Sequence, residues 1–291
     1  IVFTALNPAF FTLRNLSGIF TIVSELGMET IGECFLIISG EFDLSVGSVY
    51  AFSCFIMAKL AVYMPSPIAA LGTLGVAAGI GYLNSILVLR FRIPSFIATL
   101  GGMWIYRGSM LALTGGETIP YTGDDIMFVA MSKQIGWFRP SHVWFLVMGL
   151  SFSFLLTRTT YGNWSFATGG SLLTARALGV PVDRVKRINF MMCSMTASMA
   201  GIIVMTRFDM ADASFGMLTE LEAVASTVIG GTYLFGGYGT ILGCLLGTCI
   251  VGMVRIGLVM AGAPGYWYQS FVGATLVIAA IVNQKLRRAQ A

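Results

Sequence analysis

The fold of this chain is decided by a polar stretch, residues 157–189, which reads TRTTYGNWSFATGGSLLTARALGVPVDRVKRIN. Long apolar runs lie on either side of it. It carries one acidic residue, Asp183, against five basic ones: Arg158, Arg176, Arg184, Lys186 and Arg187. Lys and Arg beside membrane spans mark the cytoplasmic side. Residues 157–189 are therefore predicted to form a cytoplasmic loop between two membrane-spanning helices.

Within this loop, residues 171–178 have the composition of a helix. Gly169 and Gly170 precede them, and Gly179, Val180 and Pro181 follow, as start and stop signals. We expect a short helix outside the bilayer, where a partner protein can reach it.

The composition is that of a membrane protein. Hydrophobic residues make up 56% of the chain, mean hydropathy is +0.83, and charged residues make up 10%, against about 25% in soluble domains. The net charge of +4 does not indicate nucleic-acid binding, because the basic residues lie at the ends of apolar runs, where membrane topology explains them.

The sequence gives no support to an enzyme. Its five cysteines lie in apolar runs without metal-ligand spacing, and it has a single histidine, His142. A Ser/His/Asp triad or a histidine-based metal site therefore has little support. The Gly-Lys-Ser/Thr signature of a nucleotide-binding loop is also missing from the sequence. We expect no catalytic residue, metal or cofactor, and an ATPase on a separate chain if ATP drives the protein.

Apolar segments set the predicted architecture. A helix needs about 20 apolar residues to cross a bilayer core of about 30 Å. Nine segments meet or approach this length: 17–38, 44–63, 67–89, 94–113, 141–157, 188–206, 222–236, 239–260 and 266–284. We predict an all-α, polytopic helical bundle that forms one transmembrane domain over residues 1–291.

Basic residues set the predicted orientation. Two predicted spans separate the first basic cluster from the second, and four separate the second from the third: Arg90 with Arg92, the 157–189 loop, and Lys285 with Arg287 and Arg288. All three then lie on the cytoplasmic side, with the C-terminus inside and Ile1 outside. Because the chain opens on Ile1 without a methionine, we expect it to be truncated. A missing first helix would bring the count to ten.

Three carboxylates lie in the first predicted span. Glu25, Glu29 and Glu33 follow one another at four-residue spacing and so share one helical face. A carboxylate at bilayer depth needs a wet cavity or a partner. Two interpretations stay open: a polar lining of a translocation path, or a stripe near the interface or against a neighbouring helix.

Four further residues complete the candidates for such a path: Asp43, Ser45, Asn84 and Thr99. Asp43 directly precedes an apolar run, so capping of the next helix is favoured over a substrate role. Asn84 lies in the third span, where an Asn more often bonds a neighbouring helix than a substrate. Arg107, in the last third of the fourth span, could extend to the outer surface.

Two connections have a predicted conformation. Residues 114–140 form the longest external segment, and we expect residues 126–131 to form a short helix lying on the membrane. This segment either receives an external partner or is a passive connection. The glycine-rich residues 230–239 are expected to form a tight turn between two short helices, because they lack the lysine of a phosphate loop.

Four motifs, in order along nearly the full chain, resemble the permease subunits of bacterial ABC sugar importers of the ribose/xylose/arabinose/galactose type. They are FDLSVGS at 42–48, PSFIATLG at 94–101 with Arg107-Gly108, ATGG at 167–170 leading through Ala175-Arg176 to Gly179-Val180, and VIGGT at 228–232 with GGYG at 236–239. Each motif alone is modest evidence for the family, but the four together, in this order and at this spacing, are specific to it.

The resemblance implies a ten-helix permease of the type II importer kind in the bacterial inner membrane. Such a permease forms a dimer, with itself or with a sister permease, and works with an ATP-binding subunit and a periplasmic sugar-binding protein. The family's coupling helix corresponds to residues 169–180. The coupling residues are then Gly169, Gly170, Leu172, Leu173, Arg176, Leu178 and Gly179. The translocation path would lie at or near the dimer interface.

The chain departs from the family pattern in its acidic residues. Gly40-Glu41 stands where a Gly-Gly pair is usual, and the stripe Glu25, Glu29 and Glu33 is unusual. The substrate is therefore left open among a monosaccharide, a polyol, a sugar amine or another polar solute. The alternative function is an ion-coupled secondary transporter in which Glu25, Glu29, Glu33 or Asp43 takes up protons. Such a protein should show an inverted internal repeat, and the order of the four motifs shows no such repeat.

Overall fold

The computed structural model describes residues 2–123 and 125–290. It is built almost entirely of helices, with one pair of two-residue strands in antiparallel register. In chain order the elements are α1 (Val2–Leu6), η1 (Pro8–Phe11), α2 (Leu13–Ile38), α3 (Val46–Leu60), α4 (Ser66–Leu89), α5 (Ser95–Thr114), β1 (Ile119–Pro120), α6 (Asp125–Met131), α7 (Pro140–Arg158), α8 (Thr160–Gly170), α9 (Leu172–Ala177), α10 (Val182–Phe208), β2 (Met210–Ala211), α11 (Thr219–Ile229), α12 (Ile241–Met260) and α13 (Tyr266–Gln290).

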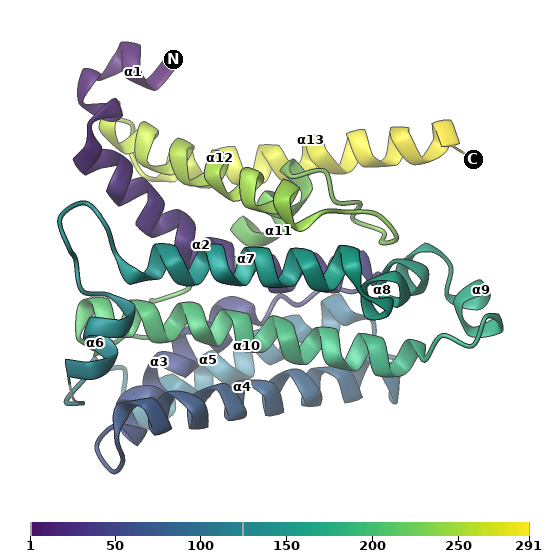
Figure 1. Ribbon diagram of the computed structural model, residues 1–291, viewed down its shortest axis with the longest axis horizontal. Helices are drawn as coiled ribbons and strands as arrows, with labels where there is room; N and C mark the ends of the chain where they lie inside the picture. The colour runs from purple at the N-terminus through teal and green to yellow at the C-terminus, as the bar shows by residue number, and fades with distance from the viewer. Residues whose placement is uncertain (1, 124, 291) are drawn as a thin grey trace.

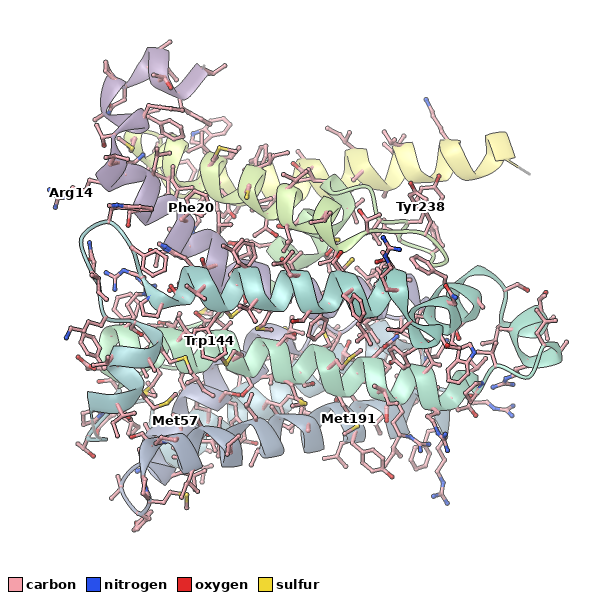
Figure 2. All side chains as sticks on the ribbon, viewed as in Figure 1. Arg14, Phe20, Met57, Trp144, Met191 and Tyr238 are labelled. Atoms are coloured by element: carbon pink, nitrogen blue, oxygen red, sulfur yellow. The ribbon has the colours of Figure 1, made fainter. Side chains whose placement is uncertain are left out.

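The long helices run side by side and give the bundle two distinct ends (Figure 1). One end carries α1 and α6, and the other carries α8, α9 and the C-terminal end of α13. We call them the α6 end and the α9 end. Figure 2 places Arg14 at the α6 end and Tyr238 toward the α9 end.

Helix α2 lies at the centre of the bundle. It packs against α7, α10, α11 and α12, and its residues from Val23 to Ile38 are buried almost without interruption. Such burial on all faces suits a helix enclosed by other helices. The three carboxylates of α2 therefore lie inside the protein, away from lipid.

Each of the nine predicted apolar segments overlaps a helix, but residues 230–236 of the seventh segment lie in the turn that follows α11. Within the described residues, four helices are long and apolar enough to cross a membrane by length and composition: α4, α7, α10 and α12. Large apolar side chains point outward from the bundle, including Leu71, Trp104, Leu150 and Leu246. An apolar exterior around a core that holds charged side chains is the arrangement expected of a protein surrounded by lipid.

The connections differ from expectation in two places. Helix α8 was not predicted; it begins where the Thr159 hydroxyl caps the backbone N–H of Gly162, and it ends at Gly170. Gly169 and Gly170 therefore end one helix rather than begin another, and Ser171 caps α9. Helix α6 packs against α4, α7 and α10 and buries Met127 and Met131, so it belongs to the bundle and does not lie apart on its surface.

Candidate functional site

A polar cavity of about 390 Å³ lies among α2, α10, α11 and α12. We call it the acidic cavity. Carboxylates and guanidinium groups from all four helices reach its wall, together with aromatic rings and the segment that precedes α11. Its lining comprises Ile22, Glu25, Leu26, Glu29, Tyr50, Val204, Arg207, Phe208, Ser214, Phe215, Gly216, Met217, Thr219, Glu222 and Arg255.

Two of the carboxylates in the acidic cavity are paired with arginines. Both side-chain oxygens of Glu25 contact Arg207, with Nε–Oε1 and Nη2–Oε2 distances of 2.8 Å. On the facing wall, Nη1 of Arg255 lies 3.2 Å from Oε2 of Glu222. In the Glu25–Arg207 pair only the Nη2–Oε2 contact has hydrogen-bond geometry, so the pair is an ion pair with one charge-assisted hydrogen bond.

Glu29 differs from these two residues. Its side chain is fully buried, and neither carboxylate oxygen has a hydrogen-bond partner in the part of the chain that the structure describes. The hydroxyl of Thr219, also on the cavity wall, is near enough to interact with it. Four-residue spacing on α2 places Glu29 one turn below Glu25 on the same face.

The segment between α10 and α11 forms one wall of the acidic cavity through residues 214–217. It enters the bundle as irregular backbone, with positive φ at Asp209, Gly216 and Leu218, and reaches Gly47 at the start of α3. Non-helical backbone at this depth is tolerated where it lines a cavity or is held by protein groups. Arg107 supplies such groups: it donates to the carbonyls of Ala213 and Phe215. The expectation that Arg107 extends to the outer surface is therefore wrong.

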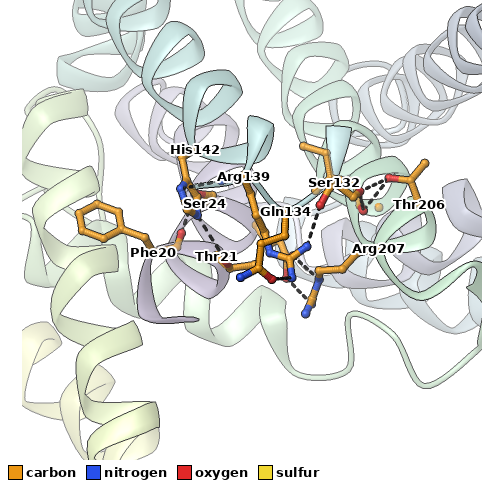
Figure 3. Close-up of polar contacts among 12 residues, drawn as sticks. Phe20, Thr21, Ser24, Ser132, Gln134, Arg139, His142, Thr206 and Arg207 are labelled. Carbon is orange, nitrogen blue, oxygen red and sulfur yellow. Dashed lines mark hydrogen bonds and ion pairs between the residues drawn. The ribbon is translucent and has the colours of Figure 1, made fainter. Parts of the chain in front are cut away.

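A second polar cluster lies beside Arg207 (Figure 3). Arg139 donates to the carbonyl of Ser132 and to Oε1 of Gln134, both at 2.7 Å, and lies beside Arg207. Burial and the neighbouring guanidinium of Arg207 lower the pKa of Arg139, which precedes α7, while Glu25 raises it. The charge of Arg139 thus acts on the Glu25–Arg207 pair from outside the cavity lining.

Glu33 belongs to a different group of side chains, which we call the inner polar network. Its Oε1 accepts from the backbone N–H of Asp43 at 3.2 Å, and its Oε2 accepts from the thiol of Cys193 at 3.3 Å. Asn84 donates to Oδ2 of Asp43 and to Oγ of Ser45, at 3.2 and 2.9 Å. These bonds fix the connection between α2 and α3.

Asp43 does not cap α3. Ser45 occupies the N-cap position, and Oδ1 of Asp43 accepts from the backbone N–H and the hydroxyl of Ser45 at 2.8 and 2.5 Å. Thr99 of α5 holds the same connection, because its Oγ1 accepts from the N–H of Leu44 at 3.0 Å. Asp43 lies outside the helices, and burial raises its pKa, against the bonds from Ser45 and Asn84 that lower it.

Glycines bring three connections together toward the α9 end. Gly40 follows α2, Gly169 and Gly170 end α8, and Gly236 with Gly237 lies between α11 and α12. The N–H of Gly237 donates to the carbonyl of Ile38 at 2.8 Å. A Cβ on Gly236 would lie 2.9 Å from Cα of Gly40 and 3.0 Å from Cα of Gly169. The first distance is shorter than real Cβ contacts, and the second is shorter than most of them. We call this contact the glycine junction.

Helix α9 presents apolar side chains outward at the end of the bundle. Leu173 and Leu178 are 82% and 76% exposed, and Ala175 is buried. Arg176 forms an ion pair of 2.8 Å with Asp183, and Lys186 forms another with Glu41. A groove of about 710 Å³ runs beside α9 between these pairs and the α4–α5 connection, with Leu172, Arg176, Lys186, Arg92 and Ser95 among its lining residues.

The structure divides the seven candidates for a translocation path into two sets. Glu25 and Glu29 line the acidic cavity, whereas Glu33, Asp43, Ser45, Asn84 and Thr99 hold one another or the α2–α3 connection. Arg207, Arg255 and Glu222 were not among the candidates. Their signal in the sequence was an arginine in or beside an apolar run, since such a residue needs an acidic partner.

Comparison with known proteins identifies the family. Residues 15–280 match the family described as branched-chain amino acid transport system / permease component. The chain is 33% identical to the ribose import permease protein RbsC of Escherichia coli K12, over 97% of this chain and 88% of that protein. It is also 33% identical to the autoinducer 2 import system permease protein LsrC of Klebsiella pneumoniae, over 100% of this chain and 85% of that protein.

A third relative comes from a different organism. The xylose/arabinose import permease protein XylH of Sulfolobus acidocaldarius is 30% identical over 97% of this chain and 81% of its own length. No solved structure matches the chain. The relatives give no support to an ion-coupled secondary transporter. The chain belongs to this permease family and is a multi-pass inner-membrane subunit of an ABC importer.

Proposed function

We propose that this permease forms the translocation pathway for a monosaccharide or related polar solute, in an ABC importer of the type II kind. The import permeases of ribose, autoinducer 2 and xylose or arabinose are its relatives. Nine segments cross the membrane in this proposal: the helices α2, α3, α4, α5, α7, α10, α12 and α13, and the short helix α11 together with the irregular backbone that leads into it. The α9 end faces the cytoplasm, with the C-terminus on that side, and a periplasmic binding protein docks at the α6 end.

The distribution of basic residues supports this orientation. Arg90, Arg92, Arg158, Arg184 and Arg187 lie in or beside the connections at the α9 end. An excess of Lys and Arg in connections marks the cytoplasmic side.

The observation that carries the proposal is the exposure of leucines on α9. Leu173 lies on the six-residue helix α9 with its side chain in solvent. Its side chain therefore does not stabilise the permease alone. Exposed apolar side chains grouped on a helix mark a surface that a partner covers. The partner in this proposal is the ATP-binding subunit, which Gly169, Gly170, Leu172, Leu173, Arg176, Leu178 and Gly179 contact or position.

The glycine junction offers a route for motion from α9 into the bundle. Backbone at the end of α8 touches the ends of α2 and the α11–α12 connection without intervening side chains. Because packed interfaces do not deform continuously, a shift of one of these elements should shift the elements packed against it. A displacement of α9 by the ATPase would therefore reach α2, whose other half carries Glu25 and Glu29.

The importer contains two permease chains in this proposal, either two copies of this chain or this chain with a sister permease. ATP binding and release would shift the pair between states that open to either side. Each state is stabilised only by contacts that differ between the two.

A test uses Leu173→Asp, which places a charge on the exposed face of α9. We expect the variant to enter the membrane normally, to lose most co-purification of the ATPase, and to fall at least tenfold in ATP-dependent uptake. Leu6→Asp is the matched control, because Leu6 is 64% exposed on α1 at the opposite end. Normal uptake by Leu173→Asp would contradict the proposal.

A further inference from the structure

The arginines around Glu29 are engaged mainly by other groups. Four carboxylates act on this part of the bundle: Glu25, Glu29, Glu220 and Glu222. Arg207 pairs with Glu25, Arg255 pairs with Glu222, and Arg107 interacts with Glu220. The fourth guanidinium in reach, that of Arg139, acts on Glu25 and is bonded to Ser132 and Gln134 outside the lining. Within the described residues Glu29 forms no ion pair with an arginine, and the guanidinium of Arg107 acts on it only from a distance.

Glu29 is also the carboxylate with unused hydrogen-bonding capacity. It is fully buried and lines the acidic cavity, and within residues 2–123 and 125–290 neither oxygen has a partner in hydrogen-bond geometry, although the hydroxyl of Thr219 is a neighbouring donor. A buried carboxylate without a partner is costly, so it is retained where it has a function. A ligand that brings a donor and a positive charge would remove that cost.

We infer that the acidic cavity accepts a solute with a positively charged amino group, which binds Glu29 while its hydroxyl groups contact the two arginine–carboxylate pairs. This inference rests on the proposed function, because it makes the cavity a station on the solute's path. It narrows the solute from any polar sugar or polyol to one that carries an amine.

The size and walls of the cavity favour an organic cation over a metal ion. Its volume of about 390 Å³ is far larger than a single ion requires, and within the described residues no group of His, Cys, Asp and Glu is arranged to hold a metal. Tyr50, Phe208 and Phe215 contribute rings to the wall, and the last two lie 5.4 Å apart between centroids. The guanidinium of Arg207 already lies over the ring of Phe208, so Tyr50 and Phe215 are the rings left to accept the apolar face of a polyol or an ammonium group.

The arginine pairs give the amine its specificity. Arg207 and Arg255 are both engaged with carboxylates, so neither competes for Glu29 through a direct contact. A solute with a carboxylate or phosphate would bring no cation to Glu29 and would add a second buried acidic group without a partner, which is costly. The cavity therefore selects by charge as well as by hydroxyl pattern.

The test measures binding to the purified membrane complex in nanodiscs by equilibrium dialysis. Two matched pairs of probes differ by one amine: glucamine against sorbitol, and glucosamine against glucose. We expect at least one amine to bind ten times more tightly than its hydroxyl counterpart. Glu29→Gln should abolish that preference, whereas Glu29→Asp should keep most of it because the charge remains.

Glu33→Gln is the control variant, since Glu33 lies on α2 one turn further along but binds Cys193 and Asp43 outside the cavity lining. It should keep the preference for the amine. Gel filtration of every variant reports folding separately from binding.

Three results would overturn the inference: no amine preferred over its counterpart, a preference that Glu29→Gln leaves unchanged, or displacement of the bound amine by an equal concentration of NaCl. The last result would assign Glu29 to a metal ion. Co-purification of the ATPase is scored in the same preparations. Its absence would remove the proposed function, whereas its presence without an amine preference would remove only the inference.

Discussion

At the scale of single residues, the acidic cavity depends on charges that lie far apart in sequence. Glu25 on α2 meets Arg207, which ends α10, and Glu222 on α11 meets Arg255 on α12. The four-residue spacing of Glu25, Glu29 and Glu33 predicted their shared face. It did not predict their separation, since the α10–α11 segment encloses the first two while Asp43 and Cys193 engage the third.

Arg207→Ala should destabilise the protein more than the same change in a Glu25→Gln background. Removing one partner of a buried pair leaves an uncompensated charge, which costs about 3–5 kcal/mol, and removing both charges costs less. Thermal unfolding in detergent of the wild type, both single variants and the double variant measures the coupling. Additive effects in this cycle would show that the Glu25–Arg207 contact contributes no coupling.

Asn84→Asp should loosen the α2–α3 connection. The amide of Asn84 donates to Asp43 and Ser45, and an Asp would place a carboxylate against Oδ2 of Asp43. A buried donor replaced by a like charge costs at least about 1–3 kcal/mol. Unfolding temperature should fall, and Asn84→Asp combined with Asp43→Asn should recover part of the loss. A drop that the second change fails to reduce would place the cause elsewhere.

At the scale of elements, sequence pattern located the helices but not their contacts. Apolar runs and flanking glycines predicted the nine long segments and the short helix near residue 175, because both signals are local. Helix α8 was missed because its composition, TYGNWSFATGG, contains three glycines and weak periodicity. Its cap at Thr159 and its packing on α7 and α10 stabilise it instead.

Gly169→Ala should break the glycine junction. A Cβ there would collide with the carbonyl of Ile38 and the backbone nitrogen of Gly237, neither of which can move independently. Overpacking costs about 1–3 kcal/mol, so we expect a lower unfolding temperature and uptake reduced at least tenfold. Gly101→Ala is the control: Gly101 is also helical, and nothing lies within 4 Å of an added Cβ. Equal unfolding temperatures and equal uptake for the two variants would show that the glycine junction has no role in transport.

At the scale of the whole molecule, the sequence predicted a membrane bundle with two unlike ends. Composition and the periodic placement of Lys and Arg carried that prediction. The central place of α2 was not predictable, because it depends on which helices pack together. The sequence also did not predict that residues 209–218 enter the bundle. An acidic, glycine-containing stretch is typical of an exposed loop, and its contact with Arg107 depends on the tertiary structure.

Orientation can be tested with a single cysteine at the α9 end. With the permease expressed without its ATP-binding subunit, we expect Thr174→Cys to be labelled by a membrane-impermeant maleimide in inverted vesicles and not in intact spheroplasts, because Thr174 is exposed on α9. Within the described residues four native cysteines are buried and Cys249 is half-buried, so background labelling should be low. Labelling in spheroplasts alone would reverse the proposed orientation.

The most direct test of the account is photo-crosslinking from α9 in native membranes. A benzophenone maleimide attached to Leu173→Cys should form a covalent adduct with the ATP-binding subunit, and the same probe at Leu6→Cys should not. Adducts with the ATPase from position 6 but not from position 173, or adducts with lipid alone from position 173, would contradict the claim that α9 receives the motion that drives transport.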